Sequence, residues 1–146
     1  MAVTADVLLA IHVYPHSGDR TPTIRIANVQ STKFTSSEFE IPVEGDVKID
    51  AEAHDWSNYF KSGLKGALSQ IRSRSSSDDA QFVPRSMDVL VDGKVPSGGG
   101  LSSSAALVCG SALAVLKANT EGPIEKKDLV ELAIVSERNV GVFSGG

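Results

Sequence analysis

Cysteine is nearly absent from this sequence: Cys109 is the only one among 146 residues. One thiol cannot form a disulfide within the chain, so a disulfide-stapled scaffold is excluded for these residues. Cys109 falls inside an apolar run at residues 105–116, which predicts a buried thiol that acts as a small hydrophobic side chain. This use of cysteine is typical of a reducing compartment.

Long hydrophobic runs and a strong charge bias are absent too. No apolar run approaches the ~20 residues that span a bilayer, and the N-terminus lacks the basic region of a signal peptide. Lys and Arg number 14 against 18 Asp and Glu, a formal net charge of -4, which argues against nucleic-acid binding. We therefore expect a soluble, cytoplasmic protein without a membrane or nucleic-acid partner.

The N-terminal part of the chain alternates in the way that predicts β-strands. Residues 3–13 are predicted to form a buried strand, and residues 23–29 the second arm of a hairpin with it. Apolar side chains within residues 34–43 indicate one more edge strand. A further short strand is predicted at residues 87–91, ended by the Asp-Gly turn pair at residues 92–93.

Helical spacing of apolar residues predicts three helices. The first begins at Trp56, with Asp55 as its N-cap, and continues to about residue 71. The second, at residues 102–119, is apolar on nearly every face and is predicted to be buried all round. The third, at residues 125–140, carries one apolar stripe. Strands followed by helices on one face indicate an α+β fold.

Three glycines at residues 98–100 and three serines at residues 102–104 stand at the start of the second predicted helix. Such a turn can hold an anion, because the first helical N–H groups have no partners and the helix dipole is positive there. The serine hydroxyls can bind phosphate oxygens or Mg²⁺. The loop fits neither the Walker pattern nor the dinucleotide fingerprint, so a phosphate site here belongs to another class. A serine-capped helix without any ligand is the alternative.

Residues 96–106, Pro-Ser-Gly-Gly-Gly-Leu-Ser-Ser-Ser-Ala-Ala, resemble the central motif of the GHMP kinases. Within that family, the chain resembles the fungal galactokinases. Residues 56–61 resemble their tryptophan–asparagine–tyrosine segment. Residues 136–141 and 144–146 are similar to the segment that leads into their catalytic aspartate. The resemblance covers essentially the whole chain.

The resemblance implies roles for individual residues. Trp56 and Tyr59 would contact adenine, although the helical spacing alone would make both of them core residues. Ser104 and Glu137 would bind magnesium, although Glu137 alone would be read as a solvated helix charge. The backbone of Gly145 would lie against the sugar. The ATP phosphates would be bound by Pro96, Gly98, Gly99, Gly100, Leu101, Ser102, Ser103, Ser104 and Ala105.

The resemblance also implies a fold and an activity. Residues 1–146 would form part of the N-terminal, ATP-binding domain of a GHMP kinase, a mixed sheet with helices on one face that is like domain 2 of ribosomal protein S5. The complete protein would use ATP and Mg²⁺ to phosphorylate galactose to galactose 1-phosphate. The sugar-binding turn is expected before Met1 and the catalytic aspartate just after Gly146. No catalytic residue is therefore expected in this chain, which would be inactive alone.

Three alternatives remain open from the sequence. One is a kinase for a related sugar, such as N-acetylgalactosamine. Another is a non-catalytic sensor of galactose and ATP that acts on a transcriptional repressor; the complete Ser-Ala stretch at residues 102–106 favours the enzyme, because such sensors can lack residues there. The last is a soluble domain with no ligand at the loop.

Overall fold

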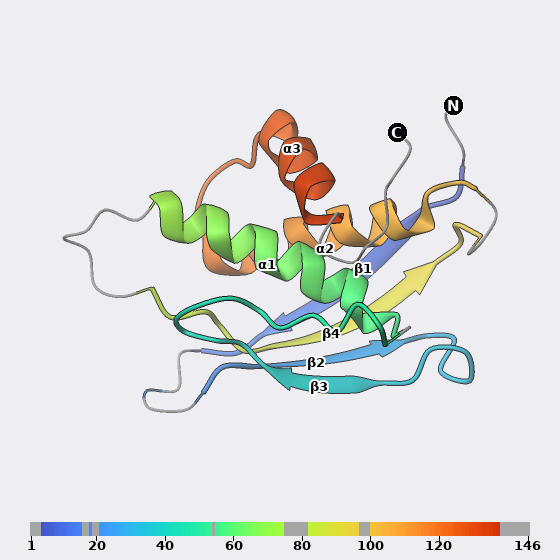
Figure 1. Ribbon diagram of the computed structural model, residues 1–146, viewed down its shortest axis with the longest axis horizontal. Helices are drawn as coiled ribbons and strands as arrows, with labels where there is room; N and C mark the ends of the chain where they lie inside the picture. The colour runs from blue at the N-terminus through green and yellow to red at the C-terminus, as the bar shows by residue number, and fades with distance from the viewer. Residues whose placement is uncertain are drawn as a thin grey trace.

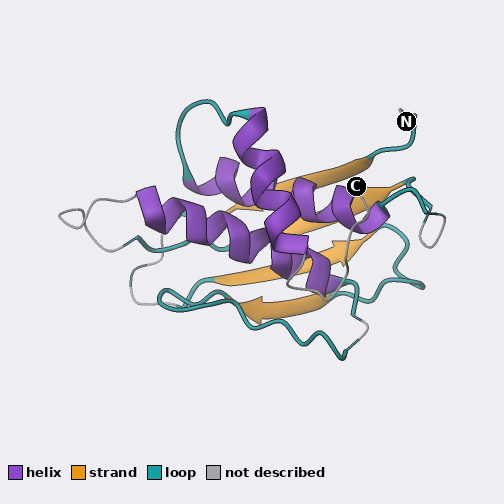
Figure 2. Ribbon diagram, turned by 45° about the horizontal axis from the view of Figure 1, so that its top comes forward, coloured by secondary structure: helices purple, strands orange, loops and turns teal. Residues whose placement is uncertain are grey.

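The computed structural model describes residues 4–15, 18, 21–53, 55–74, 82–96 and 100–137. These residues form a mixed sheet with three helices on one side of it: two helices lie next to the sheet, and the last helix of the chain packs on those two (Figures 1 and 2). The arrangement confirms the predicted α+β class. In chain order the elements are β1 (Val7–Val13), β2 (Thr23–Asn28), β3 (Ser37–Glu40), α1 (Ser57–Arg74), β4 (Met87–Gly93), α2 (Ser103–Asn119) and α3 (Lys126–Glu137).

The sheet has the strand order β1-β4-β2-β3. β4 is antiparallel to β1 and parallel to β2, while β3 is antiparallel to β2. The predicted hairpin between residues 3–13 and 23–29 is therefore wrong, because β4 lies between these two strands. Alternation identifies the buried face of a strand but not its neighbour. Pairing β2 with β4 places the buried Ile24 and Ile26 beside Met87 and Val89, so their apolar faces join under the helices.

The strand boundaries also differ from the prediction. β1 begins at Val7 and is not buried as predicted, since Leu8 is 57% exposed. β4 continues through Asp92 and Gly93, the predicted turn pair, because β1 pairs with both of them. The predicted edge strand at residues 34–43 is shorter: only Ser37–Glu40 pairs with β2. Phe34 instead lies in a turn, where its N–H donates to the carbonyl of Gln30.

The core lies between the sheet and α1. Phe60, Leu64 and Leu68 lie on one face of α1, are at most 1% exposed, and pack on the inner rows of β2 and β4. The predicted cap is confirmed, since Asp55 accepts a hydrogen bond from the N–H of Ser57 at 2.9 Å. On another face of α1, a Cβ added at Gly63 would lie 2.5 Å from the carbonyl oxygen of Val108, so the absence of a side chain lets α2 approach closely.

α2 is less buried than its sequence predicts. Leu113 is 39% exposed and Lys117, one turn later, is exposed as well, so one face of this helix remains uncovered. Cys109 is only half-buried; its burial still raises the pKa of the thiol above its ordinary value. In α3, Ser136 is buried, and the helix is described as far as Glu137. The predicted continuation to residue 140 lies outside the described residues.

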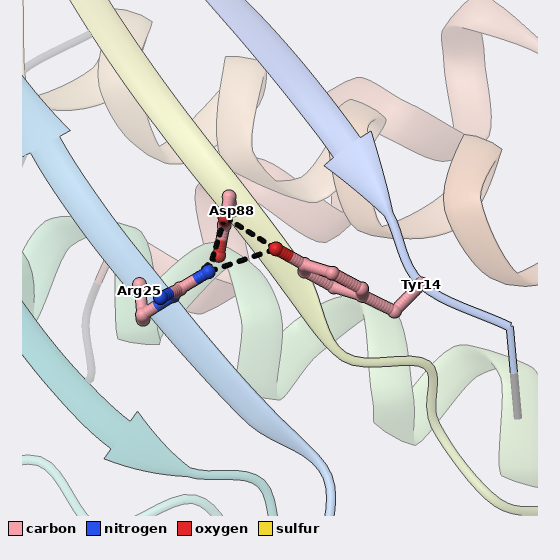
Figure 3. Close-up of polar contacts among 3 residues, drawn as sticks. All are labelled: Tyr14, Arg25 and Asp88. Carbon is pink, nitrogen blue, oxygen red and sulfur yellow. Dashed lines mark hydrogen bonds and ion pairs between the residues drawn. The ribbon is translucent and has the colours of Figure 1, made fainter. Parts of the chain in front are cut away.

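The outer face of the sheet carries a polar cluster of three residues (Figure 3). Asp88 on β4 accepts hydrogen bonds from Nε and Nη2 of Arg25 on β2 at 2.7 and 2.6 Å, and from the hydroxyl of Tyr14 at 2.7 Å. The Arg25 guanidinium holds the pKa of the Asp88 carboxyl below its usual value. The hydrogen bond to Asp88 raises the pKa of Tyr14. The cluster joins the end of β1 to the two central strands on the side away from the helices.

Candidate functional site

A cavity of about 760 Å³ opens at the edge of the sheet where the parallel strands β2 and β4 both end. The start of α1 and the first turn of α2 border the same cavity, so segments far apart in the sequence meet there. In Figure 1 this is the side of the molecule where the yellow β4 arrow points. The cavity is lined by Val7, Asn28, Gln30, Lys33, Phe34, Trp56, Tyr59, Val91, Asp92, Gly93, Lys94, Val95, Pro96, Ser103, Ser104 and Leu107.

Five of the residues predicted from the sequence line this cavity together: Trp56, Tyr59, Pro96, Ser103 and Ser104. The cavity thus connects the segment expected at adenine with the segment expected at the phosphates. The expected adenine contacts and the expected phosphate contacts come from separate segments of the sequence. The fold places residues of both segments in this cavity.

The other predicted site residues have different positions. Residues 97–99, with Gly98 and Gly99, lie outside the described residues, as does residue 145, the predicted sugar contact Gly145. The remaining loop residues adjoin the cavity in sequence but are not among its described lining residues; they are Gly100, Leu101, Ser102 and Ala105.

One wall of the cavity is aromatic. The rings of Phe34 and Trp56 have centroids 5.7 Å apart, and the Trp56 indole N–H donates to the carbonyl of Thr35 at 2.8 Å. Lys33 Nζ lies 5.0 Å from the centroid of the Phe34 ring. Trp56 is half-buried and also packs against the core, so it contributes to the core as well as to the cavity. Such a wall suits a flat, aromatic ligand group.

Another part of the lining belongs to the first turn of α2, which contributes Ser103 and Ser104. Gly100 and Ser102 both have left-handed backbones, with φ of 67° and 55°, and this turn leads the chain into the helix. Ser102 makes no side-chain capping hydrogen bond, so the alternative of a simple serine-capped helix lacks its defining contact. The first turn of α2 contains no acidic residue. The positive dipole end of this helix is therefore suited to an anion.

Sequence reasoning missed several lining residues. Lys33 and Phe34 lie in the connection after β2, and Asp92 and Lys94 lie at the end of β4. None of these residues belongs to a recognisable motif. Asp92 was predicted to lie in a turn, so it was not considered as a site residue. Lys94 alone offered a signal, a cation two residues before Pro96 and the glycine loop. Lys33 and Lys94 bring positive charge to the cavity that the first turn of α2 also lines.

Oxygen donors of the kind that Mg²⁺ prefers are present in the cavity. The hydroxyl of Ser104 and the carboxylate of Asp92 both line it. Glu137 is the last residue of α3, and its side chain lies outside the described atoms. Among the described residues, no group of three His, Cys, Asp or Glu side chains is placed to hold a metal ion. The donors fit an ion that keeps most of its waters and takes further ligands from phosphates.

Residues 58–146 match the family described as GHMP kinases N terminal domain, and the chain belongs to this family. Within it, the chain is similar to galactokinases. It is 39% identical over 150 residues to galactokinase of Saccharomyces cerevisiae and 36% identical over 149 residues to that of Schizosaccharomyces pombe. Each match covers all of this chain but only 28% of the relative.

Solved structures agree on the fold. The structure of Lactococcus lactis galactokinase complexed with galactose matches with a TM-score of 0.66 at 23% identity, over 98% of this chain and 32% of that one. Methanococcus jannaschii mevalonate kinase matches with a TM-score of 0.63 at 15% identity, over 93% and 38%. At these identities the likeness concerns the fold alone. No helix in the described part of the chain is long and apolar enough to cross a membrane.

Proposed function

We propose that the complete protein containing this chain transfers the terminal phosphoryl group of ATP to galactose, giving galactose 1-phosphate. The observation that carries the proposal is the single cavity that joins Trp56 and Tyr59 to Ser103 and Ser104. The similarity to curated galactokinases supports the choice of sugar. Because the chain spans 28% of the Saccharomyces cerevisiae relative, the activity is assigned to the complete protein.

In this proposal the adenine of ATP lies against the aromatic wall, and its phosphates lie at the start of α2. Backbone N–H groups from Gly98 to Ala105 bind the phosphate oxygens, and the helix dipole adds attraction. Lys33 and Lys94 balance part of the phosphate charge. ATP is thereby held at both ends.

Magnesium and sugar complete the proposed site. The Ser104 hydroxyl and the Glu137 carboxylate hold Mg²⁺, which neutralises charge on the phosphoryl oxygens when it is bound. The backbone of Gly145 contacts galactose. Phosphoryl transfer depends chiefly on positioning and charge stabilisation, so residues outside this chain that orient the sugar are needed for turnover. Residues 1–146 are then an ATP-binding part of a domain in a cytoplasmic enzyme.

Trp56 provides the test, because it lines the cavity, and a Trp56→Phe variant separates its fluorescence from that of any tryptophan outside residues 1–146. We expect ATP with Mg²⁺ to change its fluorescence in a saturable way in the complete protein. AMP should bind at least about tenfold more weakly, because it cannot reach the α2 end with β- and γ-phosphates. An unchanged fluorescence, together with no heat of binding, would refute the nucleotide site.

Assays of ADP release with different sugars distinguish galactokinase from the other two candidates, a kinase for N-acetylgalactosamine and a sensor without activity. Galactose-dependent release of ADP by the complete protein supports the proposal, and a clear preference for N-acetylgalactosamine would replace galactose as the substrate. Binding of ATP and galactose without turnover, together with a galactose-dependent complex with a transcriptional repressor, would instead establish the sensor.

A further inference from the structure

α3 is fastened to α1 at its C-terminal end. The hydroxyl of Ser62 on α1 donates a hydrogen bond to the backbone carbonyl of Ser136 on α3. Both residues are buried, Ser62 at 0% and Ser136 at 1% exposure. Ser62 therefore satisfies a buried acceptor that water cannot reach.

One turn along the same face of α1, Gly66 brings the two helices into close contact. A Cβ at this position would lie 2.9 Å from Cδ2 of Leu132 and would overlap the hydroxyl of Ser136. Residues four apart lie on the same face of a helix. Ser62 and Gly66 therefore form one surface of α1, and this surface contacts Leu132 and Ser136 of α3. The polar contact fixes the rotation of α3, and the missing side chain fixes its distance from α1.

This contact is separate from the face of α1 that packs on the sheet, where Phe60, Leu64 and Leu68 lie. It also differs from the contact of Gly63 with α2. α1 begins beside Trp56 in the cavity. One rigid helix thus supports the aromatic wall, α2 and the end of α3 through three different sets of residues.

We infer that Ser62 and Gly66 are positioning residues that fix the end of α3, and with it Glu137, relative to the first turn of α2. The inference rests on the proposed function, which assigns Glu137 to Mg²⁺. Glu137 directly follows the anchored Ser136, so a small shift of the helix end moves the backbone that carries this carboxylate. The aromatic wall has no part in the contact. Loss of the hydrogen bond from Ser62 to Ser136 therefore weakens the nucleotide binding that depends on metal and leaves metal-independent binding unchanged.

The test compares Ser62→Ala with Ser111→Ala in the protein at its full encoded length. Ser111 is also buried and lies beside Gly63, but its hydroxyl donates to Leu107 within its own helix at 2.6 Å. Both variants lose one buried hydroxyl from the packed helices, and of these two hydroxyls it is that of Ser62 that bonds to α3. ATP binding is followed by Trp56 fluorescence with EDTA and with increasing Mn²⁺, and bound Mn²⁺ is measured by electron paramagnetic resonance.

We expect Ser62→Ala to raise the half-saturating Mn²⁺ concentration about tenfold, while ATP binding in EDTA changes less than about twofold. Ser111→Ala should leave both values near those of the wild type. Ser62→Cys keeps the buried volume with only a weak donor and should behave like Ser62→Ala, which guards against a folding defect in the alanine variant. Gly66→Ala should shift the Mn²⁺ requirement in the same direction.

Two results would count against the inference, and they are distinguishable. Equal Mn²⁺ requirements in the wild type and both Ser62 variants would overturn the positioning role and leave the proposed function intact. Nucleotide binding by the wild type that is indifferent to Mn²⁺ would overturn the proposed metal site and the inference with it.

Discussion

The centroid of the Trp56 ring lies 5.7 Å from the centroid of the Phe34 ring, and the two ring planes are inclined by 60°. This pair connects the start of α1 to the segment between β2 and β3, and the indole N–H strengthens the connection by donating to Thr35. The two rings come from segments with no common motif. Their contact makes the aromatic wall of the cavity a property of the tertiary fold.

Removing the Phe34 ring should weaken nucleotide binding. Phe34→Ala deletes one side of the wall and the ring under Lys33, so we expect ATP affinity to fall about tenfold, in the range of a lost base-stacking contact. Isothermal titration calorimetry measures the change. Phe82→Ala is the control, because Phe82 is also half-buried but lines a different cavity. Equal ATP affinities for the two variants would show that Phe34 has no contact with nucleotide.

The left-handed backbone conformation of Ser102 leads to a prediction about stability. A residue other than glycine in the left-handed region costs roughly 1–2 kcal/mol, and a β-branched side chain is tolerated least there. Ser102→Gly should therefore change the free energy of unfolding by less than about 0.5 kcal/mol, since relief of strain offsets the added freedom of the unfolded chain. Ser102→Val should lose at least about 1 kcal/mol. Urea denaturation distinguishes them, and equal midpoints would contradict the left-handed turn.

The cluster of Tyr14, Arg25 and Asp88 should make stability depend on acid pH. The pKa of Asp88 is lowered by Arg25, so its contribution is present above the unfolded pKa of about 3.9 and is lost as pH falls through the folded value. The effect is small because the cluster is exposed. Asp88→Asn should lower the urea midpoint slightly at neutral pH and leave it closer to that of the wild type at about pH 3. A constant difference at every pH would show that the ion pair contributes nothing.

The 146-residue chain alone should bind nucleotide without turning it over. The galactokinase relative from Saccharomyces cerevisiae is more than three times as long as the matched segment, and sugar-orienting residues are proposed to lie outside this chain. A coupled assay for ADP should therefore show galactose-dependent release only for the complete protein. Release above background by the purified chain would place catalytic residues within it.

The sequence was most informative where a single segment carries the physical reason for the structure. Alternation at Ile24 and Ile26 predicted a strand with one buried face, and Asp55 predicted the start of α1. Residues 96–106 predicted a site at the start of α2, since a glycine turn before a helix has local causes for anion binding. Trp56 and Tyr59 were assigned to the same site through a family resemblance, and the cavity brings them together with Ser103 and Ser104.

Features that depend on contacts between distant segments were missed. The neighbour of a strand depends on the layers that form around it, so the local pattern of residues 3–13 could not reveal that β4 separates β1 from β2. Lys33 and Phe34 lie in the cavity because a turn carries them toward α1, and no periodicity marks that approach. The exposure of Leu113 likewise depends on how much of α2 the other helices cover.

The position of β4 also has a consequence for the order of folding. Its register partners on β2 are 63 positions away along the chain, and all of α1 lies between them. During synthesis, β1 and β2 leave the ribosome before the strand that separates them exists. The sheet can close only after a late, non-local insertion, a step that is slow because loop-closure entropy is lost before contacts form. The nucleotide cavity, which needs the end of β4, cannot exist before that step.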